Sequence, residues 1–296
     1  MFILEVENVR SEKLRLTQNE SKYQVVSVEG LNPPSAEIFT NTVAGLDGAL
    51  FKSSKLQMRN LVLNIKIRGD VEKNRIALYK FFRTKYPCKI YYTNESRRVY
   101  IEGYCEAIEN DLFTDNQIMQ VSIICPDPYF KSVLLMYTDI SKIFANFEFP
   151  FAFGANNSIC EASTMTDDAI IFSGIDINRR VSVTNNGEID TGVIITLTAH
   201  SDNIINPVIY EIDDKTFFKL NTTMMGGDVI IIDTNKGHKS VKMIRGVEEI
   251  NMIRYMATGS TWFQLRQGDN VFTSDADANV EDLFVVFERY NLYEGV

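Results

Sequence analysis

A series of short β-branched segments, separated by turn residues, limits the second half of the chain to an antiparallel β fold. Residues 228–233 are mostly Val and Ile, and the turn sequence TNKG follows them. The glycine of this turn tolerates a positive φ angle, so the pattern predicts a β-hairpin with a return strand over residues 238–244. Further turn residues recur about every ten positions, which is typical of a β-sandwich.

Four stretches resemble the distal tail proteins of bacteriophages with long tails. They are IIIDTNKGHKSV (residues 230–241), STWFQLRQGDNVF (260–272), NLYEGV (291–296) and CPDPYF (125–130). The last closes a half of strands and one helix that resembles the ring-forming domain of that family. The resemblance covers nearly all of the chain and implies a mainly β protein whose C-terminal domain is an antiparallel, galectin-like or jelly-roll sandwich.

The N-terminal half is predicted to be β-sheets with one helix. Leu61, Leu63 and Ile65 alternate with more polar residues, as in a half-buried strand. Residues 70–86 predict the helix, with Asp70 as N-cap, Glu72 in the first turn and Pro87 ending it. Its apolar stripe consists of Val71, Leu78, Phe82 and Tyr86, flanked by Ala77 and Phe81. Residues 35–56 are polar and weakly periodic, and they predict an extended loop or irregular hairpin.

Prolines mark the predicted domain boundary. Pro126 and Pro128 prevent a central strand from continuing, so residues 1–130 form the first predicted domain. Residues 131–155 form a linker or strand segment, and residues 156–296 form the sandwich. The linker includes an aromatic stretch at 143–153, which we expect to lie in a groove, tying the domains together or contacting a neighbouring subunit.

Composition excludes several classes of protein. The 296 residues carry a formal net charge of -9, which argues against a protein that grips nucleic acid by its phosphates. No signal peptide or membrane-spanning run is expected, so we expect a soluble protein made in the cytoplasm, with no membrane partner. The four cysteines, Cys88, Cys105, Cys125 and Cys160, are interpreted as small apolar residues.

No arrangement of residues in the sequence predicts catalysis, a cofactor or a metal. His200 and His238 flank turns and are interpreted as surface residues. Asp275, Asp277 and Asn279 mimic the start of a calcium loop that lacks its later ligands. Gly237 to Ser240 lacks the spacing of a phosphate-binding loop. Glu106, Glu109 and Asp111 are interpreted as loop charges, because spacing alone does not place carboxylates across a cleft.

Trp262 supports an alternative function. The only tryptophan of the chain is a candidate platform on which a sugar ring stacks, which would make the protein a carbohydrate-binding β-sandwich for host-surface glycans. The competing interpretation is that Trp262 belongs to the core, because it lies beside Phe263 and Leu265 in a predicted strand. A wall hydrolase with paired carboxylates is a third hypothesis, with less support.

The resemblance implies a structural function without enzymatic activity. Members of the family form a homohexameric ring at the end of the tail tube, which here maps to the helix at 70–86 and the strands up to residue 124. DNA passes through the ring without specific binding, and the sandwich serves as a platform. The implied partners are the tail tube protein, the tape-measure protein, and the tail-tip or receptor-binding proteins. The implied location is the virion tail, assembled in the host cytoplasm. Strand edges and the hairpin around Asn94 are the surfaces expected to join the subunits.

Overall fold

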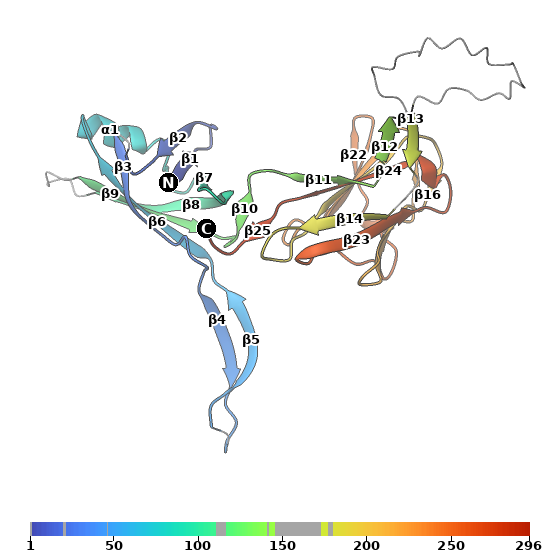
Figure 1. Cartoon of the computed structure of the whole chain (residues 1–296), viewed down its shortest axis with the longest axis horizontal. Coiled ribbons are helices and arrows are strands. Elements are labelled where there is room, and N and C mark those ends of the chain that lie inside the picture. The colour runs from blue at the N-terminus through green and yellow to red at the C-terminus, as the bar shows by residue number, and fades with distance from the viewer. Residues whose placement is uncertain are drawn as a thin grey trace, which may run out of the picture. The chain divides into compact units, whose positions relative to one another are not determined.

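The computed structural model describes residues 2–19, 22–45, 47–110, 117–140, 142–145, 173–176 and 180–296. They form two compact units (Figure 1). Unit 1 comprises Met1–Leu135, Asn186–Thr191 and Tyr290–Val296, and unit 2 comprises Met136–Asn185 and Gly192–Arg289. The chain enters unit 1 three times, so no single cut in the sequence separates the units. Within the segments discussed above, the aromatic residues 146–153 and Cys160 lie outside the described residues.

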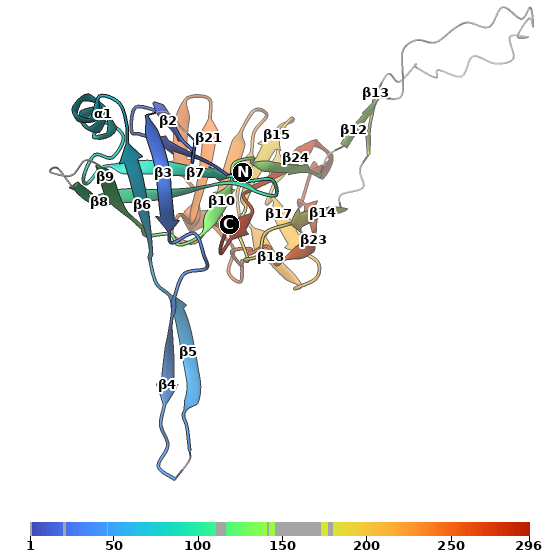
Figure 2. The ribbon, with the colours of Figure 1, turned by 60° about the vertical axis from the view of Figure 1, so that its left-hand side comes forward.

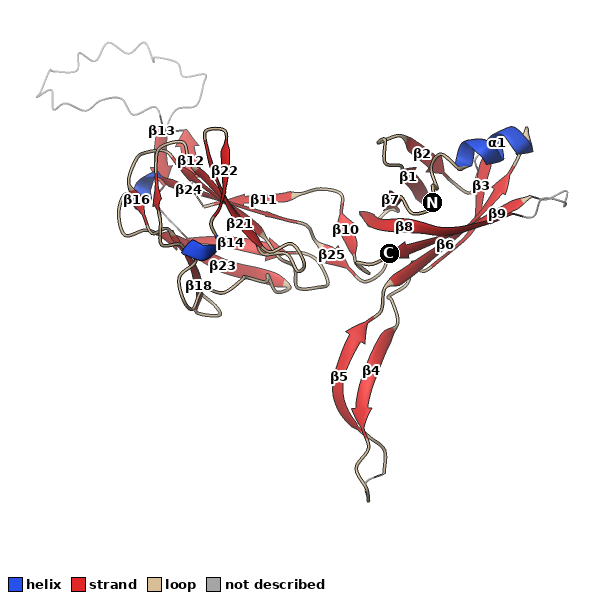
Figure 3. Ribbon diagram, turned by 180° about the vertical axis from the view of Figure 1, so that it is seen from behind, coloured by secondary structure: helices blue, strands red, loops and turns tan. Residues whose placement is uncertain are grey.

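One antiparallel sheet forms most of unit 1 (Figure 3). Its strands follow the order β2-β1-β7-β8-β9-β6-β3, and β10 pairs with β8 and with β25. A backbone bridge between Thr17 and Gln24 joins the two outermost strands, so the sheet curls back on itself. The strands are β1 (Ile3–Glu7), β2 (Lys13–Leu16), β3 (Tyr23–Glu29), β6 (Arg59–Ile67), β7 (Pro87–Thr93), β8 (Arg98–Asn110), β9 (Ile118–Cys125), β10 (Phe130–Ser132) and β25 (Leu292–Tyr293).

Strand β6 shows how the sequence pattern builds the core of unit 1. Leu61, Leu63, Ile65 and Ile67 are buried, and the residues between them are half-buried. The predicted half-buried strand is therefore confirmed. Each of these side chains contributes about 1.5–3 kcal/mol by leaving water, and they pack with the inward residues of β1, β7, β8 and β9.

The helix is shorter than predicted. α1 spans Val71–Leu78, and Asp70 occupies the N-cap position without a side-chain hydrogen bond to the helix. Glu72 lies in the first turn, as predicted. After Leu78 the chain continues through turns. Lys85, with a φ of 70°, donates its backbone N–H to the Cys105 carbonyl oxygen in β8, over 3.1 Å. Phe82 is still buried, but it reaches the core from a turn. Tyr86 is exposed.

α1 has eight residues. In the described part of the chain, no helix is both long and apolar enough to cross a membrane.

Residues 290–296 complete unit 1. The backbone N–H of Ser132 donates to the Asn291 carbonyl oxygen over 2.9 Å, next to the pairing of β10 with β25. Arg97 donates to the Gly295 carbonyl oxygen over 2.6 Å, and its guanidinium carbon lies 4.6 Å from the centre of the Tyr293 ring. The C-terminal residues are therefore held by side-chain contacts as well as by strand pairing.

Two sheets that share one core form unit 2, which confirms the predicted antiparallel sandwich. One has the order β11-β24-β15-β20-β21-β22 and the other β14-β23-β17-β18. Two smaller pairs, β16-β19 and β12-β13, complete the described sheets. The strands are β11 (Met136–Asp139), β12 (Lys142–Ala145), β13 (Ser173–Asp176), β14 (Arg180–Asn185), β15 (Ile194–Ala199), β16 (Ile204–Ile205), β17 (Val208–Glu211), β18 (Thr216–Lys219), β19 (Thr223–Met224), β20 (Val229–Asp233), β21 (Ser240–Arg245), β22 (Glu248–Asn251), β23 (Gly268–Asp275) and β24 (Leu283–Arg289), with 3-10 helices η1 (Ile253–Tyr255) and η2 (Val280–Asp282).

Aromatic rings join the two sheets of unit 2. Phe272 in β23 lies with its ring centre 4.9 Å from that of Phe287 in β24 and 5.3 Å from that of Phe263. All three side chains are buried. The predicted hairpin is confirmed as β20 and β21, which pair from Val229 with Ile244 to Asp233 with Ser240.

The segment around Trp262 departs from the prediction. Residues 260–267 lie outside the strands, and β23 begins at Gly268. Burial nevertheless alternates, because Phe263 and Leu265 are buried while Trp262 and Gln264 are half-buried. The segment supplies core side chains without belonging to a sheet, so its alternating pattern was wrongly interpreted as a strand.

Candidate functional site

A free hairpin arm is the most prominent feature of unit 1. It consists of β4 (Ala36–Asn41) and β5 (Leu50–Leu56), which pair with each other in a separate two-stranded sheet. Figures 1 and 2 show it projecting away from the main sheet of the unit. At its base, the backbone N–H of Gln57 donates to the Ser35 carbonyl oxygen over 3.1 Å. The irregular hairpin expected over residues 35–56 is therefore an ordered arm.

Strand register determines which side chains share a face of the arm. Ile38 pairs with Ser54 and Thr40 pairs with Phe51, so Ile38 and Phe51 lie on one face. Phe39 pairs with Ser53 and Asn41 pairs with Leu50, which places Phe39 and Leu50 on the opposite face. The register shift between the Phe39 and Thr40 pairs accommodates one extra residue in β5.

Both faces of the arm expose large apolar side chains to solvent. Phe51 is 67% exposed and Ile38 is 63% exposed on one face, and Leu50 and Phe39 are exposed on the other. An isolated two-stranded hairpin is at best marginally stable in water. Exposed apolar groups beside unpaired strand edges mark a surface suited to contact with another chain. A partner that covered one face alone would leave apolar side chains on the other face in water.

The hairpin around Asn94 does not provide the free edge that was expected of it. Strand β7 lies between β1 and β8, and β8 lies between β7 and β9, so the ladder edges of this hairpin are paired. Its turn is closed by the Asn94 side-chain oxygen, which accepts from the backbone N–H groups of Ser96 (3.0 Å) and Arg97 (2.6 Å). In the described part of unit 1, the arm instead presents the long unpaired edges.

Trp262 packs on the core of unit 2. Its ring centre lies 5.3 Å from that of Phe218 in an edge-to-face arrangement, and the ammonium of Lys239 lies 5.6 Å from its centre. Phe218 is fully buried and Trp262 is half-buried. The indole thus packs against the core of the sandwich, while part of its surface remains accessible.

Two residues of the sequence that resembles a calcium loop, Asp277 and Asn279, form hydrogen bonds or ion pairs with other residues of unit 2. Asp277 accepts from the Asn206 side-chain amide over 2.7 Å and forms an ion pair with Lys219 at 3.1 Å. These two contacts, that of Asn206 first, lower the pKa of Asp277. The Asn279 amide donates to the Asp202 carbonyl oxygen over 3.1 Å. Among the described residues, no group of three or more His, Cys, Asp or Glu side chains is placed to hold a metal ion.

The other candidate residues occupy separate places. The His200 ring lies 4.1 Å from the Phe284 ring, measured between centres. Glu106 accepts from the Ser122 hydroxyl over 3.0 Å, and Asp111 lies outside the described residues. Burial raises the pKa of Cys88 and of Cys125 to about 12, so both thiols stay protonated near neutral pH and lack the thiolate that a nucleophile needs.

Comparison with known proteins matches both halves of the chain. Residues 12–123 match the model of the phage tail protein RIFT-related domain. Residues 186–289 match the model of the siphovirus-type tail component, C-terminal domain. No curated protein sequence matches the chain.

Two solved structures share its fold. The Dit protein of phage SPP1, described as a paradigm of the hub adsorption apparatus in phages that infect Gram-positive bacteria, gives a TM-score of 0.66 at 15% identity. That match covers 98% of this chain and 99% of that chain. A chain of the phage P2 baseplate, in its activated conformation with calcium, gives a TM-score of 0.53 at 11% identity and covers both chains fully. At these identities the superpositions establish the fold alone.

Proposed function

Because this chain belongs to the siphovirus-type tail components, the distal tail proteins of bacteriophages, we propose that it is a structural hub of the virion tail that forms a ring at the end of the tail tube. In this proposal unit 1, which contains residues 1–130, forms the ring, and unit 2, which contains most of residues 156–296, forms the platform for tail-tip and receptor-binding proteins. The tail tube and tape-measure proteins contact the ring. The negative net charge suits a channel through which DNA slides without binding.

The arm formed by β4 and β5 is the observation that supports ring formation. A ring requires a heterologous interface, in which one surface of a subunit fits a different surface of the next and the rotation closes. An arm that carries apolar side chains on both faces fits this requirement, because it projects away from the main sheet of unit 1 and is covered only when another chain surrounds it. A stable contact of this kind buries about 800 Å² on each partner.

Measurement of the assembly state tests this proposal. We expect the purified chain to elute as a single assembly of about six chains of 33.8 kDa each in size-exclusion chromatography with light scattering, and to give rings in negative-stain electron microscopy. Replacing Ile38 and Phe51 by Ser on one face, or Phe39 and Leu50 by Ser on the other, should each reduce the assembly to monomers.

A matched substitution controls for a general loss of surface hydrophobicity. Val247 is fully exposed in the turn between β21 and β22 of unit 2, and Val247→Ser should leave the assembly intact. A chain that stays monomeric at every concentration, or rings that survive both double substitutions, would contradict the proposed role of the arm. Circular dichroism of each variant would show that unit folding is retained.

A further inference from the structure

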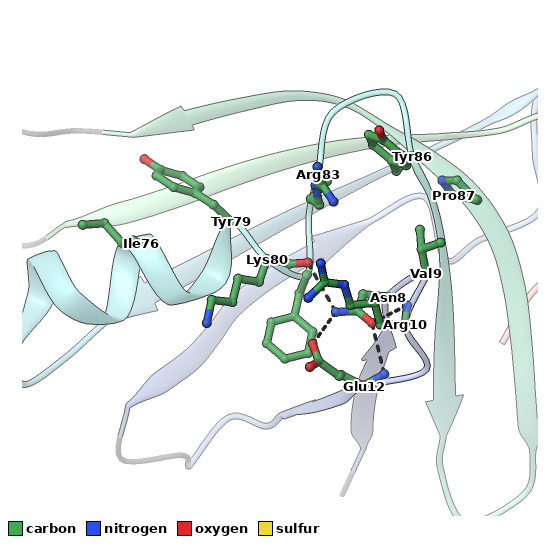
Figure 4. Close-up of a pocket in the computed structure, with 11 residues that line it drawn as sticks. Asn8, Val9, Arg10, Glu12, Ile76, Tyr79, Lys80, Arg83, Tyr86 and Pro87 are labelled. Carbon is green, nitrogen blue, oxygen red and sulfur yellow. Dashed lines mark hydrogen bonds between the residues drawn. The ribbon is translucent and has the colours of Figure 1, made fainter.

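A groove of about 490 Å³ lies on unit 1 (Figure 4), and none of the residues that line it belongs to the arm. One wall is the turn between β1 and β2, which contributes Asn8, Arg10 and Glu12. The other wall is α1 together with the turns that follow it, as far as Pro87. The volume lies within the range of about 300–1,000 Å³ that is usual for ligand sites, and it accommodates a few side chains of a peptide.

The turn that forms the first wall is held by Asn8. The Asn8 side-chain oxygen accepts from the backbone N–H groups of Arg10 (2.9 Å) and Glu12 (3.0 Å). Its side-chain amide donates to the Glu12 carboxylate over 2.8 Å and to the Lys80 carbonyl oxygen over 3.4 Å. The last contact joins the two walls, so the groove is formed before any ligand binds.

Three cationic side chains line the groove. They are Arg10, Lys80 and Arg83, and all three are exposed. Within the described residues, none of them is in an ion pair. The Arg83 guanidinium carbon lies 4.5 Å from the centre of the Tyr86 ring, which holds the guanidinium at the rim. Among the residues that the structure describes, Glu12 is the only carboxylate in the lining. In a chain of net charge -9, this is a local excess of positive charge.

Exposed apolar side chains gather in the same groove. Val9, Ile76, Tyr79 and Tyr86 all line it, and all are exposed. Val9, with 57% of its surface accessible, comes from the first wall, and Ile76, with 53%, comes from the second. Grouped apolar side chains beside cations mark a binding surface for a ligand that is both apolar and anionic.

We propose that this groove binds an acidic peptide segment of a partner protein, in which carboxylates flank a large apolar residue. The apolar residue packs among Val9, Ile76 and Tyr79, and the carboxylates accept charge-assisted hydrogen bonds from Arg10, Lys80 and Arg83. A nucleic acid fits less well, because its continuous row of phosphates would lie against Glu12 and near a strongly acidic chain.

Fluorescence anisotropy with a labelled peptide tests the proposal on the full chain. The probe is the peptide Gly-Glu-Glu-Phe-Glu-Glu-Gly, and its control has Gln in place of each Glu. We expect saturable binding of the acidic peptide in the micromolar range, at least about tenfold weaker binding of the Gln peptide, and weakening with added salt.

Charge reversals locate the site. Arg10→Glu, Lys80→Glu and Arg83→Glu should each weaken binding of the acidic peptide about tenfold or more. Arg98→Glu, which makes the same charge change at an exposed position of β8, should leave binding unchanged. Thermal melts by circular dichroism check that each variant is folded, and three independent variants keep the test valid if one of them is not.

Three outcomes of the binding measurements would overturn the proposal. They are no saturable binding of the acidic peptide, an equal loss of affinity in Arg98→Glu, and tighter binding of a single-stranded oligothymidylate of the same charge at the same salt concentration. Assembly is measured separately by light scattering. Charge reversals that abolish the assembly would assign the groove to contacts between copies of the chain and would also contradict the proposal.

Discussion

The guanidinium carbon of Arg59 lies 4.6 Å from the centre of the Phe130 ring, and both side chains are buried in unit 1. The guanidinium donates to the carbonyl oxygens of Pro128 (2.8 Å) and Asn32 (2.6 Å), and it also bonds to those of Gly30 and Glu294. One side chain thus holds three segments that are far apart in the sequence. Burial, the largest cause, lowers the pKa of Arg59.

Replacement of this arginine should strongly destabilise unit 1. In Arg59→Met the side-chain stem is retained, but four carbonyl oxygens lose their donor, and each unsatisfied buried group costs about 1–3 kcal/mol. We expect the free energy of unfolding to fall by about 3 kcal/mol or more in urea titrations. Arg98→Met, at an exposed position, is the control. A difference of less than about 1 kcal/mol between the two variants would contradict the role of Arg59.

The ion pair of Asp228 and Arg245 should make unit 2 less stable in acid. Arg245 Nε donates to the Asp228 carboxylate over 2.9 Å, and these hydrogen bonds, more than any other contact, lower the pKa of Asp228. Because the folded pKa lies below the unfolded value of about 3.9, the added stability is present above that pH and is lost as pH falls through the folded pKa.

Asp228→Asn should therefore destabilise unit 2 at pH 7 by about 1–3 kcal/mol, less than for a fully buried pair because Arg245 is partly exposed. The difference from the unsubstituted chain should shrink in thermal melts below about pH 4. Glu281→Gln, at an exposed position, is the control for removal of one carboxylate from unit 2. A difference between Asp228→Asn and the unsubstituted chain that is constant with pH would refute the assignment.

The contribution of Glu211 to the stability of unit 2 should depend on pH in the opposite direction to that of Asp228. It is 4% exposed, and burial raises its pKa, although the Thr216 hydroxyl donates to it over 3.1 Å. The folded state therefore binds a proton more tightly than the unfolded state, and stability declines as pH rises through the folded pKa. Glu211→Gln keeps the acceptor for Thr216 and removes the charge. We expect it to raise the free energy of unfolding by about 1 kcal/mol at pH 7 and to have little effect below about pH 4. Equal stabilisation at both pH values would rule out the charge as the cause.

Trp262→Ala separates the packing and carbohydrate hypotheses. Contact with Phe218 predicts a loss of about 2 kcal/mol in the free energy of unfolding, because the indole is only half-buried. Trp262→Phe should recover most of this stability. The carbohydrate hypothesis predicts instead a saturable affinity for a surface glycan that Trp262→Ala abolishes while the fold persists. A glycan array and thermal melts on both variants decide between the hypotheses.

Local patterns predicted the β-sandwich well. The β-branched run of β20 favours a strand, and the TNKG sequence between β20 and β21 favours a hairpin turn, without help from distant residues. In β6, the alternation of apolar and polar residues matches the alternation of buried and half-buried side chains. The helix was predicted too long because Phe82 and Tyr86 continue its apolar spacing, whereas Phe82 reaches the core from a turn and Tyr86 is exposed. The arm was only partly predicted, because both of its faces are exposed and no alternation distinguishes them.

Local sequence patterns did not predict the contacts between residues that are far apart in the chain. Asn186-Gly187 is typical of a hairpin turn, yet the segment that contains it belongs to unit 1, where Glu188 forms an ion pair with Arg97. The groove brings Arg10 together with Lys80 and Arg83, about 70 positions later. No local spacing relates Arg10 to the other two, because they meet where the turn between β1 and β2 contacts the turn after α1 through Asn8 and Lys80.

The return of residues 290–296 to unit 1 has a consequence for the order of events during translation. The ribosome makes the N-terminal strands first. Strand β10 cannot pair with β25, and Arg59 cannot donate to the Glu294 carbonyl oxygen, until all of unit 2 has been synthesised. Unit 1 therefore remains incomplete while the sandwich of unit 2 is synthesised. The final closure of unit 1 is therefore a late step in the folding of the chain.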